Sequence, residues 1–351
     1  MLGNGAAQPA LRVLLDGRLI RPFSTGIGRY IRELARALDR HSSLSVTVGC
    51  SVYGDAAHSW ARSHGLDVYR LGDVRIPGVI PRWRFDVFHV TYPVIAPPLL
   101  SPPIVLTVHD LIHDDPRFAP LQKRAAFLIA TQTMIWRAAV IVAVSEATAL
   151  ELRARRIGTR SVRVVGNGVS PEMLWAHPVA EPGEIYLYFG NARAHKGIRW
   201  LLEAVNRAGV QLTIATSDEG ELAQLLKATE SDLRYVGVVR NATDEVLQGL
   251  VDRAKAVIVP SAIEGFGIPA AEALARGRPV ICSDIRALRE VCQDSAVYVP
   301  FEDVSALEGA LRMRIADEPA DRRRRTALAR ARFNWCDKAE ELIACYQLAL
   351  A

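Results

Sequence analysis

The chain has 351 residues, of which 50% are hydrophobic and 23% charged, with a formal net charge of +5 at pH 7. This length allows two domains of ordinary size, and the hydrophobic content excludes a largely disordered chain. The apolar runs are shorter than the roughly 18 residues of a membrane-spanning helix, and the first ten residues lack the basic and apolar regions of a signal peptide. We therefore expect a cytoplasmic protein in which residues 1–10 form a loose tail.

The charge is unevenly distributed along the chain. Residues 1–171 contain 21 Lys and Arg against 12 Asp and Glu, a net charge of +9, whereas the remainder has a net charge of −4. Arg82, Trp83, Arg84 and Phe85 interleave basic and aromatic residues in this basic half. The pattern is typical of proteins that lie on the anionic inner face of a cell membrane, and ordinary exposed helices account for it equally well.

The first half alternates apolar, β-branched runs with helical patterns. Strands are predicted at residues 11–15, 46–50, 85–90, 104–108, 138–144 and 161–165. Helices are predicted at residues 29–38, 119–137 and 146–156, the last one capped by Ser145. A loop with two glycines, residues 21–28, separates the first strand from the first helix. This alternation predicts an α/β fold with a parallel sheet.

The second half begins at Ile185, after a linker marked by Pro171, Pro178 and Pro182. Strands are predicted at residues 185–190, 211–215, 233–239, 256–259, 280–282 and 296–299. Helices are predicted to begin near residue 198 and to cover residues 222–228, 244–254, 270–276, 305–315 and 337–350. Two further caps are predicted, Thr243 for the helix that follows it and Ser283 or Asp284 for a helix that ends at Val291.

Residues 255–280 contain the most informative pattern of the chain. An apolar strand is followed by a loop with two glycines, Gly265 and Gly267, and then by helix-forming sequence. Free backbone amides at the start of such a helix, together with the helix dipole, favour binding of a phosphate or diphosphate. Glu264 and Glu272 stand beside this predicted anion site, where carboxylates are suited to accept hydrogen bonds from sugar or ribose hydroxyls. Each feature alone is more often a simple turn or a partner of the helix dipole.

The whole segment resembles the signature of the retaining GT-B glycosyltransferases of family 4, in which two glutamates stand eight residues apart, as Glu264 and Glu272 do. The resemblance covers nearly the whole chain. It implies an α/β protein of GT-B fold, with two facing Rossmann-like domains and a cleft between them. The acceptor domain would be residues 11–170 and the nucleotide-sugar domain residues 171–336, while residues 337–351 would form a helix that packs back on the first domain.

The resemblance also assigns roles in the second half. Glu272 would accept hydrogen bonds from the ribose hydroxyls and Glu264 from the sugar hydroxyls, while Lys196 would stabilise the departing diphosphate, whose charge grows as its bond breaks. Many relatives place an arginine just after the strand glycine, where this chain has Asn191. The remaining donor contacts implied for this half are the backbone of Phe266, Gly267 and Ile268 at sugar and phosphate, the side chain of Arg193 at the phosphates, and the backbone of Val238 and Val239 at the nucleobase.

Three residues of the first half are implied to face the donor. Gly26 and Gly28 resemble a loop that approaches the donor diphosphate, although a GIG sequence alone predicts only a turn. His109 ends a predicted strand, and the resemblance implies that the histidine of an HD pair at this place contacts the donor sugar. Without the resemblance, a hydrogen-bonded histidine at the sheet edge is the more common situation.

No metal ion or cofactor is predicted. His113, Asp114 and Asp115 follow His109 and Asp110 closely, but the group matches no metal-binding motif. The five cysteines are odd in number and lack the spacing of a zinc site, so we expect them to be reduced.

The sequence thus predicts a metal-independent glycosyltransferase that retains the anomeric configuration. The stretches GIGRY, HDLIH and HKG resemble bacterial mannosyltransferases of lipopolysaccharide or exopolysaccharide assembly. We therefore expect GDP-mannose as donor ahead of UDP-glucose, UDP-galactose or an N-acetylhexosamine nucleotide, and a glycan or lipid-linked acceptor. Two alternatives stay open: a hydrolysing nucleotide-sugar epimerase of the same fold, and a basic, non-catalytic nucleic-acid-binding protein, which is disfavoured because no nucleic-acid-binding motif is present.

Overall fold

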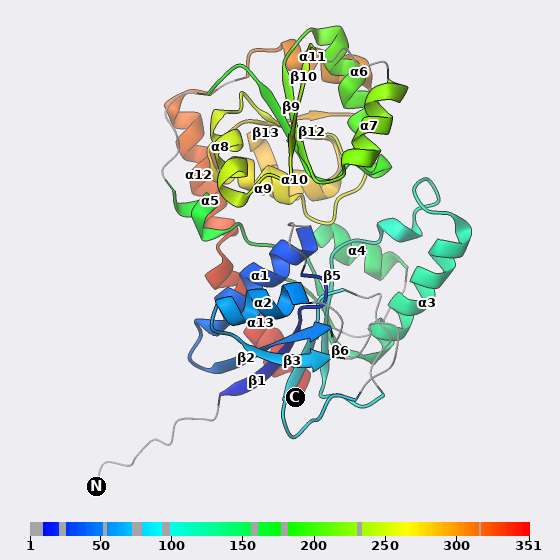
Figure 1. Cartoon of the computed structure of the whole chain (residues 1–351), viewed down its shortest axis with the longest axis vertical. Helices are drawn as coiled ribbons and strands as arrows, with labels where there is room; N and C mark the ends of the chain where they lie inside the picture. Colours follow the sequence, from blue (N-terminus) through cyan, green and yellow to red (C-terminus); the bar gives the residue numbers. More distant parts are fainter. Residues whose placement is uncertain are drawn as a thin grey trace.

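The computed structural model describes residues 10–20, 26–51, 55–71, 79–92, 99–155, 161–176, 182–229, 234–315 and 317–351. These residues form two α/β domains, one above the other in Figure 1, each built on a parallel sheet. The prediction of an α/β protein with two facing Rossmann-like domains is confirmed. The predicted N-terminal tail and most of the predicted glycine loop 21–28 lie outside the described residues.

The first sheet has seven strands in the order β3-β2-β1-β4-β5-β6-β7, and all the recorded pairings are parallel. Its strands are β1 (Leu11–Asp16), β2 (Leu44–Ser51), β3 (Asp67–Leu71), β4 (Val87–Val90), β5 (Ile104–Val108), β6 (Ala138–Ala143) and β7 (Val162–Val164). The two central strands β4 and β5 are buried along their whole length, as expected for a parallel sheet covered on both faces.

The second sheet has six parallel strands in the order β10-β9-β8-β11-β12-β13. They are β8 (Tyr186–Phe189), β9 (Leu212–Thr216), β10 (Val236–Arg240), β11 (Val257–Val259), β12 (Val280–Ser283) and β13 (Ala296–Val299). The strand order reverses between β8 and β11, and ligands of open α/β sheets bind at the carboxyl ends of strands beside such a reversal.

Helices cover both faces of each sheet (Figure 1). Those of the first half are α1 (Gly26–Asp39), α2 (Asp55–Ser63), η1 (Ile112–Asp114), α3 (Leu121–Arg137), α4 (Glu146–Ala154) and α5 (Pro171–Trp175). Those of the second half are η2 (Ala194–Lys196), α6 (Ile198–Ala208), α7 (Glu219–Ala228), α8 (Asp244–Arg253), α9 (Ile268–Ala275), α10 (Arg286–Cys292), η3 (Gln293–Ser295), α11 (Val304–Arg312), α12 (Pro319–Arg332) and α13 (Trp335–Leu350). In the part of the chain that the model describes, no helix combines the length and the hydrophobicity needed to cross a membrane.

The chain passes between the domains twice, and the two passages lie side by side. Val169 forms an isolated parallel bridge with Asn334, and its backbone N–H donates to the carbonyl of Phe333 at 2.8 Å. Beside this bridge, a Cβ atom on Gly168 would lie 2.5 Å from the ring of Trp335, so only glycine fits there. After the second passage, α13 packs within the core of the first domain.

Most predicted elements are present, with shifts of a few residues at their ends. The predicted caps Ser145 and Thr243 are confirmed, because each side chain accepts a hydrogen bond from the first turn of its helix. The cap predicted at Ser283 or Asp284 is wrong: α10 begins later, after Ile285, and makes no side-chain cap. Asp284 instead pairs with an arginine of that helix.

Several elements were not predicted, among them α2, β3 and α5. α2 and β3 lie where the apolar pattern is weakest, and β3 is an edge strand with a single fully buried residue. Pro171 was taken as part of a linker, but it opens the short helix α5. A proline suits this position because the first residue of a helix has no intrahelical use for its N–H group.

Candidate active site at the domain interface

The carboxyl ends of β5 and β11 meet at the boundary between the domains. The loop after β11 presses against the segment after β5, so that a Cβ atom on Gly265 would lie 1.7 Å from the carbonyl oxygen of His109. The hydroxyl of Ser145, at the start of α4, donates to the carbonyl of Gly265 at 2.5 Å. This approach explains why a glycine stands at position 265.

The loop continues into α9 as predicted. Gly267 has a φ of 102°, and α9 begins at Ile268 with a proline in its first turn. The ring of Phe266 is buried and packs edge-on against Phe333, 5.7 Å between centroids. The side chain of Phe266 is therefore packed in the core, and the contact of its backbone with sugar and phosphate stays a prediction.

Lys196 and Glu264 form an ion pair on the second domain. The Lys196 ammonium lies 2.7 Å from the Oε1 atom of Glu264, which also accepts a hydrogen bond of 2.8 Å from the hydroxyl of Ser261. The one-turn helix η2 is joined to the loop after β11 by the backbone N–H of Ala262, which donates to the carbonyl of His195 at 2.8 Å. The Trp200 indole N–H of the following helix α6 donates to the carbonyl of Pro260 in the same loop at 3.2 Å. The two side chains thus come from separate loops that are fixed to each other.

Glu272 pairs with an arginine of the other domain. Its side chain is fully buried, and its Oε1 atom accepts a hydrogen bond of 2.5 Å from Arg29 in the first turn of α1. Arg29 also donates to Asp244, at the start of α8, at 2.6 Å. Burial raises the pKa of Glu272, and the Arg29 charge opposes that shift. Within the described residues, the Oε2 atom of Glu272 has no hydrogen-bond partner.

His109 is a neutral side chain at this boundary. Burial lowers the pKa of His109 to about 4, and its ring is hydrogen-bonded to the backbone of Thr91. The ring also packs edge-on against Tyr30 of α1, 4.7 Å between centroids. Its buried Nε2 atom has no partner among the described residues. A neutral imidazole that donates through Nδ1 has an acceptor at Nε2, which suits a sugar hydroxyl.

The other predicted site residues lie at varying distances from this group. Gly26 and Gly28 open α1, and a Cβ atom on Gly26 would lie 3.9 Å from the side chain of Ile268, so the starts of α1 and α9 face each other. Arg193 is exposed and immediately precedes η2. Val238 and Val239 lie in β10, at the edge of the sheet, with β9 and β8 between them and β11.

Sequence reasoning missed three polar residues of the site: Arg29, Asp244 and Ser261. Arg29 was assigned only to a helix, although a cation in a first helical turn opposes the helix dipole and therefore needs another reason to be there. Asp244 was predicted only as the first residue of its helix. Nothing in the local pattern distinguishes Ser261 from a loop serine.

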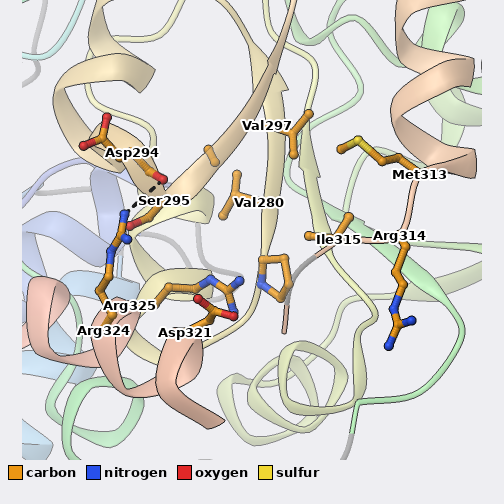
Figure 2. Close-up of a pocket in the computed structure, with 12 residues that line it drawn as sticks. Val280, Asp294, Ser295, Val297, Met313, Arg314, Ile315, Asp321, Arg324 and Arg325 are labelled. Atoms are coloured by element: carbon orange, nitrogen blue, oxygen red, sulfur yellow. Dashed lines mark hydrogen bonds between the residues drawn. The ribbon is translucent and has the colours of Figure 1, made fainter. Parts of the chain in front are cut away.

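Two further observations concern the position of the site and its chemistry. A cavity of about 190 Å³ lies between the amino ends of β12 and β13 and the start of α12, with Arg324 donating to the carbonyl of Asp294 at its edge (Figure 2). It contains none of the predicted site residues and lies at the opposite ends of the strands from Glu264, so we do not assign the donor to it. The described residues include no group of three or more His, Cys, Asp or Glu side chains arranged to hold a metal ion.

Comparison with known sequences assigns both halves to glycosyltransferase families. Residues 24–173 match the model described as Glycosyltransferase Family 4, and residues 183–317 match that described as Glycosyl transferases group 1. A GDP-mannose:cellobiosyl-diphosphopolyprenol alpha-mannosyltransferase of Xanthomonas campestris is 28% identical over 300 residues, which are 80% of this chain and 76% of the relative. A glycogen synthase of Mycobacterium tuberculosis is 27% identical over 349 residues, 90% of this chain and 79% of that enzyme.

Solved structures show the same two-domain arrangement. Sucrose-phosphate synthase from Thermosynechococcus elongatus has a TM-score of 0.72 at 20% identity, covering 96% of this chain and 98% of its own. HepE of Anabaena, in complex with UDP and glucose, has a TM-score of 0.72 at 16% identity, covering 96% of this chain and 99% of its own. At these identities the likeness establishes the fold alone.

Proposed function

Because the chain belongs to the GT-B glycosyltransferases, with a family 4 domain before a group 1 domain, we propose that it transfers a hexose from a nucleotide diphosphate sugar to a glycan or lipid-linked acceptor. One observation supports the site more than any other. The buried polar atoms Glu272 Oε2 and His109 Nε2 have no partner among the described residues, and both residues lie where the domains meet, His109 against Gly265 and Glu272 against Arg29. Buried polar atoms are seldom left without hydrogen bonds, so a bound ligand is the natural partner.

In this proposal, Lys196 supplies the charge that the reaction needs. When the bond between the anomeric carbon and the phosphate breaks, negative charge grows on the departing diphosphate, and a fixed ammonium stabilises it. Glu264 holds that ammonium and accepts hydrogen bonds from the sugar hydroxyls. Arg193, exposed beside η2, is a second candidate contact for the phosphates, which Lys196 and the α9 amides then hold without a metal ion.

Two other side chains fix the donor. Glu272 accepts from the ribose hydroxyls and His109 from a sugar hydroxyl, each through the atom that has no partner among the residues the structure describes. The acceptor hydroxyl then bonds to the anomeric carbon on the face that the diphosphate leaves. Its proton passes to a phosphate oxygen of the leaving group, so the configuration is retained and no protein base is required.

Mannose is the sugar we propose, with GDP-mannose as donor and cell-surface polysaccharide such as lipopolysaccharide or exopolysaccharide as the destination. The support is the X. campestris relative, whose name specifies GDP-mannose and a diphosphopolyprenol acceptor. The glycogen synthase of M. tuberculosis and HepE with UDP and glucose keep glucose nucleotides as rivals. The backbone of Val238 and Val239 is the proposed contact for the base.

A nucleotide-sugar panel tests this proposal. The purified protein is titrated with GDP-mannose, UDP-glucose, UDP-galactose and UDP-N-acetylglucosamine, and release of the nucleoside diphosphate is followed with and without a lipid-linked glycan acceptor. We expect saturable binding of GDP-mannose and acceptor-dependent release. Release or isomerisation of the sugar without any acceptor would favour the hydrolysing epimerase, and saturation by UDP-glucose alone would exclude mannose.

A further inference from the structure

Helix α3 is apolar on both of its long sides. One side packs in the core of the first domain through Phe127, Met134 and Ile135. The other side is exposed and carries a second apolar stripe at helical spacing, made of Leu121, Ala125, Leu128, Ile129 and Trp136. Ile129 is 68% exposed and Trp136 76% exposed. A helix with apolar residues on two sides is expected to pack against the protein on one side and against a binding partner on the other.

The exposed stripe continues onto neighbouring segments. At the C-terminal end of α3, Arg137 donates to the carbonyl of Leu99 at 3.5 Å, and Arg82 donates to the carbonyl of Ser101 at 2.8 Å. A groove of about 360 Å³ lies between these two arginines. Trp83 beside it is 78% exposed. We call the α3 stripe together with Trp83, Leu99 and Leu100 the outer face; Figure 1 shows α3 along the outer side of the first domain.

The charge of the outer face has one sign. The sequence of α3, LQKRAAFLIATQTMIWR, contains no acidic residue. Residues 79–85 and 99–108, which adjoin it, contain none either, and the next carboxylate, Asp86, is neutralised by its ion pair with Arg12 at 2.6 Å. Arg82, Arg84 and Arg137 are exposed at its border. Phe85 was expected to belong to an exposed aromatic cluster, but it is buried in the core, and Arg84 stacks over its ring at 5.6 Å.

These features fit a bilayer surface better than a protein partner. Exposed tryptophans between apolar residues and arginines are the arrangement of membrane–water interfaces, where an aromatic ring enters the apolar layer beside charged headgroups. α3 has 17 residues, about 26 Å of helix, and packs against β5 and β6 of the first sheet. The helix is therefore placed to lie along the membrane–water interface.

The outer face also ends near the proposed donor site. Phe118, which precedes α3, packs edge-on against His195, 6.1 Å between ring centroids. His195 is the neighbour of Lys196 in η2. A bilayer held against the outer face would therefore present a lipid-linked acceptor at the same side of the molecule as the diphosphate-binding residues.

We propose that the outer face binds the surface of an anionic phospholipid bilayer, with α3 in the plane of the interface and Arg82 and Arg137 at the headgroup phosphates. This extends the proposed function by stating where the acceptor is held. It does not depend on the identity of the donor, because membrane binding is measured without any nucleotide sugar.

Flotation with vesicles tests the proposal. The probes are vesicles of equal parts phosphatidylglycerol and phosphatidylcholine, and vesicles of phosphatidylcholine alone. We expect the wild type to float with the anionic vesicles and to be released by salt. The combined variant Trp83→Ser, Ile129→Ser, Trp136→Ser should bind at least about tenfold more weakly, because it removes the apolar anchors. Arg82→Gln and Arg137→Gln should each weaken binding about fivefold.

Trp175→Ser is the matched control, since it removes an exposed tryptophan of α5 that lies outside the outer face and should leave flotation unchanged. Thermal unfolding and donor turnover with a soluble acceptor should be the same for all variants, which separates loss of membrane binding from loss of folding or of catalysis. Equal flotation of the combined variant and the wild type would overturn the proposal. So would a wild type that ignores anionic vesicles but forms a dimer that the combined variant abolishes.

Discussion

Two buried cation–carboxylate pairs, one within the second domain and one between the domains, are alike in chemistry and different in their surroundings. In the core, Arg276 bonds both carboxylate oxygens of Asp252, at 2.6 and 2.8 Å, and donates to the carbonyl of Ala176 at 2.8 Å. At the domain interface, Glu272 bonds Arg29 through Oε1 alone, and its Oε2 atom has no partner among the described residues. The core pair is satisfied, whereas the interface pair keeps an acceptor for a ligand.

Two buried histidines of the first domain show the same contrast. His89 is hydrogen-bonded at both ring nitrogens, to the hydroxyl of Tyr346 at 2.8 Å and to that of Thr107 at 2.8 Å. His109, at the end of the neighbouring strand, keeps Nε2 without a partner in the described part of the chain. Burial alone therefore does not distinguish a structural group from a binding group. His109 differs from His89 because its unused ring nitrogen lies at the domain boundary, beside the loop that contains Gly265.

The largest effect should come from breaking the core pair. Asp252→Ala leaves the buried Arg276 guanidinium without its carboxylate and should lower the free energy of unfolding by about 3–5 kcal/mol, measured by urea denaturation. Asp284→Ala breaks the exposed pair with Arg289 and should cost under about 1 kcal/mol. Equal stability of the two variants would show that the core pair has no special structural role.

Breaking the Lys196–Glu264 pair on the second domain should affect turnover instead. Lys196→Ala and Glu264→Ala should each lower kcat about 10²–10³-fold, because the departing diphosphate loses its fixed positive charge or the group that positions it. Unfolding should stay close to wild type by circular dichroism. Lys255→Ala, which breaks the exposed pair with Glu184, is the control and should leave turnover unchanged. Turnover at the wild-type rate in Lys196→Ala would remove its proposed role.

Acid should destabilise the protein through both histidines. Burial lowers the pKa of His109 to about 4 and that of His89 to about 3, below the value of about 6.5 in the unfolded chain. The two neutral histidines contribute fully to the free energy of unfolding above pH 6.5. This contribution is lost as the pH falls toward 4, because the unfolded chain then binds protons that the folded chain excludes. The loss is up to about 1.4 kcal/mol per pH unit for each group. His109→Asn should make this slope shallower in urea denaturation at several pH values; an unchanged slope would contradict the neutral state of His109.

The smallest effect should come from breaking the ion pair between Arg29 of the first domain and Glu272 of the second. Arg29→Gln removes the charge that opposes the raised pKa of Glu272, so more of that carboxyl becomes protonated and fewer molecules accept from ribose. The donor KM should rise about fivefold to tenfold, ~1 kcal/mol, and rise further as the pH is lowered. Arg40→Gln, at the exposed end of α1, should change neither value. A KM independent of residue 29 at all pH values would separate Arg29 from donor binding.

The contrast between core and interface also explains which features could be predicted from the sequence and which could not. The strand, glycine loop and α9 follow from local patterns in residues 255–280, and so did the caps Ser145 and Thr243. The bond between Arg29 and Glu272 joins residues 243 positions apart in two domains, and no local pattern contains that information. The missing partners of Glu272 and His109 are likewise visible only after the chain has folded.

The place of α13 affects the order in which the protein can fold. Trp335, Leu342 and Tyr346 are buried in the core of the first domain, although they follow every strand of the second sheet in the sequence. The strands of the second sheet, residues 186–299, all leave the ribosome before α13 does. The first domain therefore keeps the apolar surface for α13 uncovered while the strands of the second domain are translated. Maturation thus reverses the order of synthesis, and a nascent chain stalled before residue 335 would present that surface to chaperones.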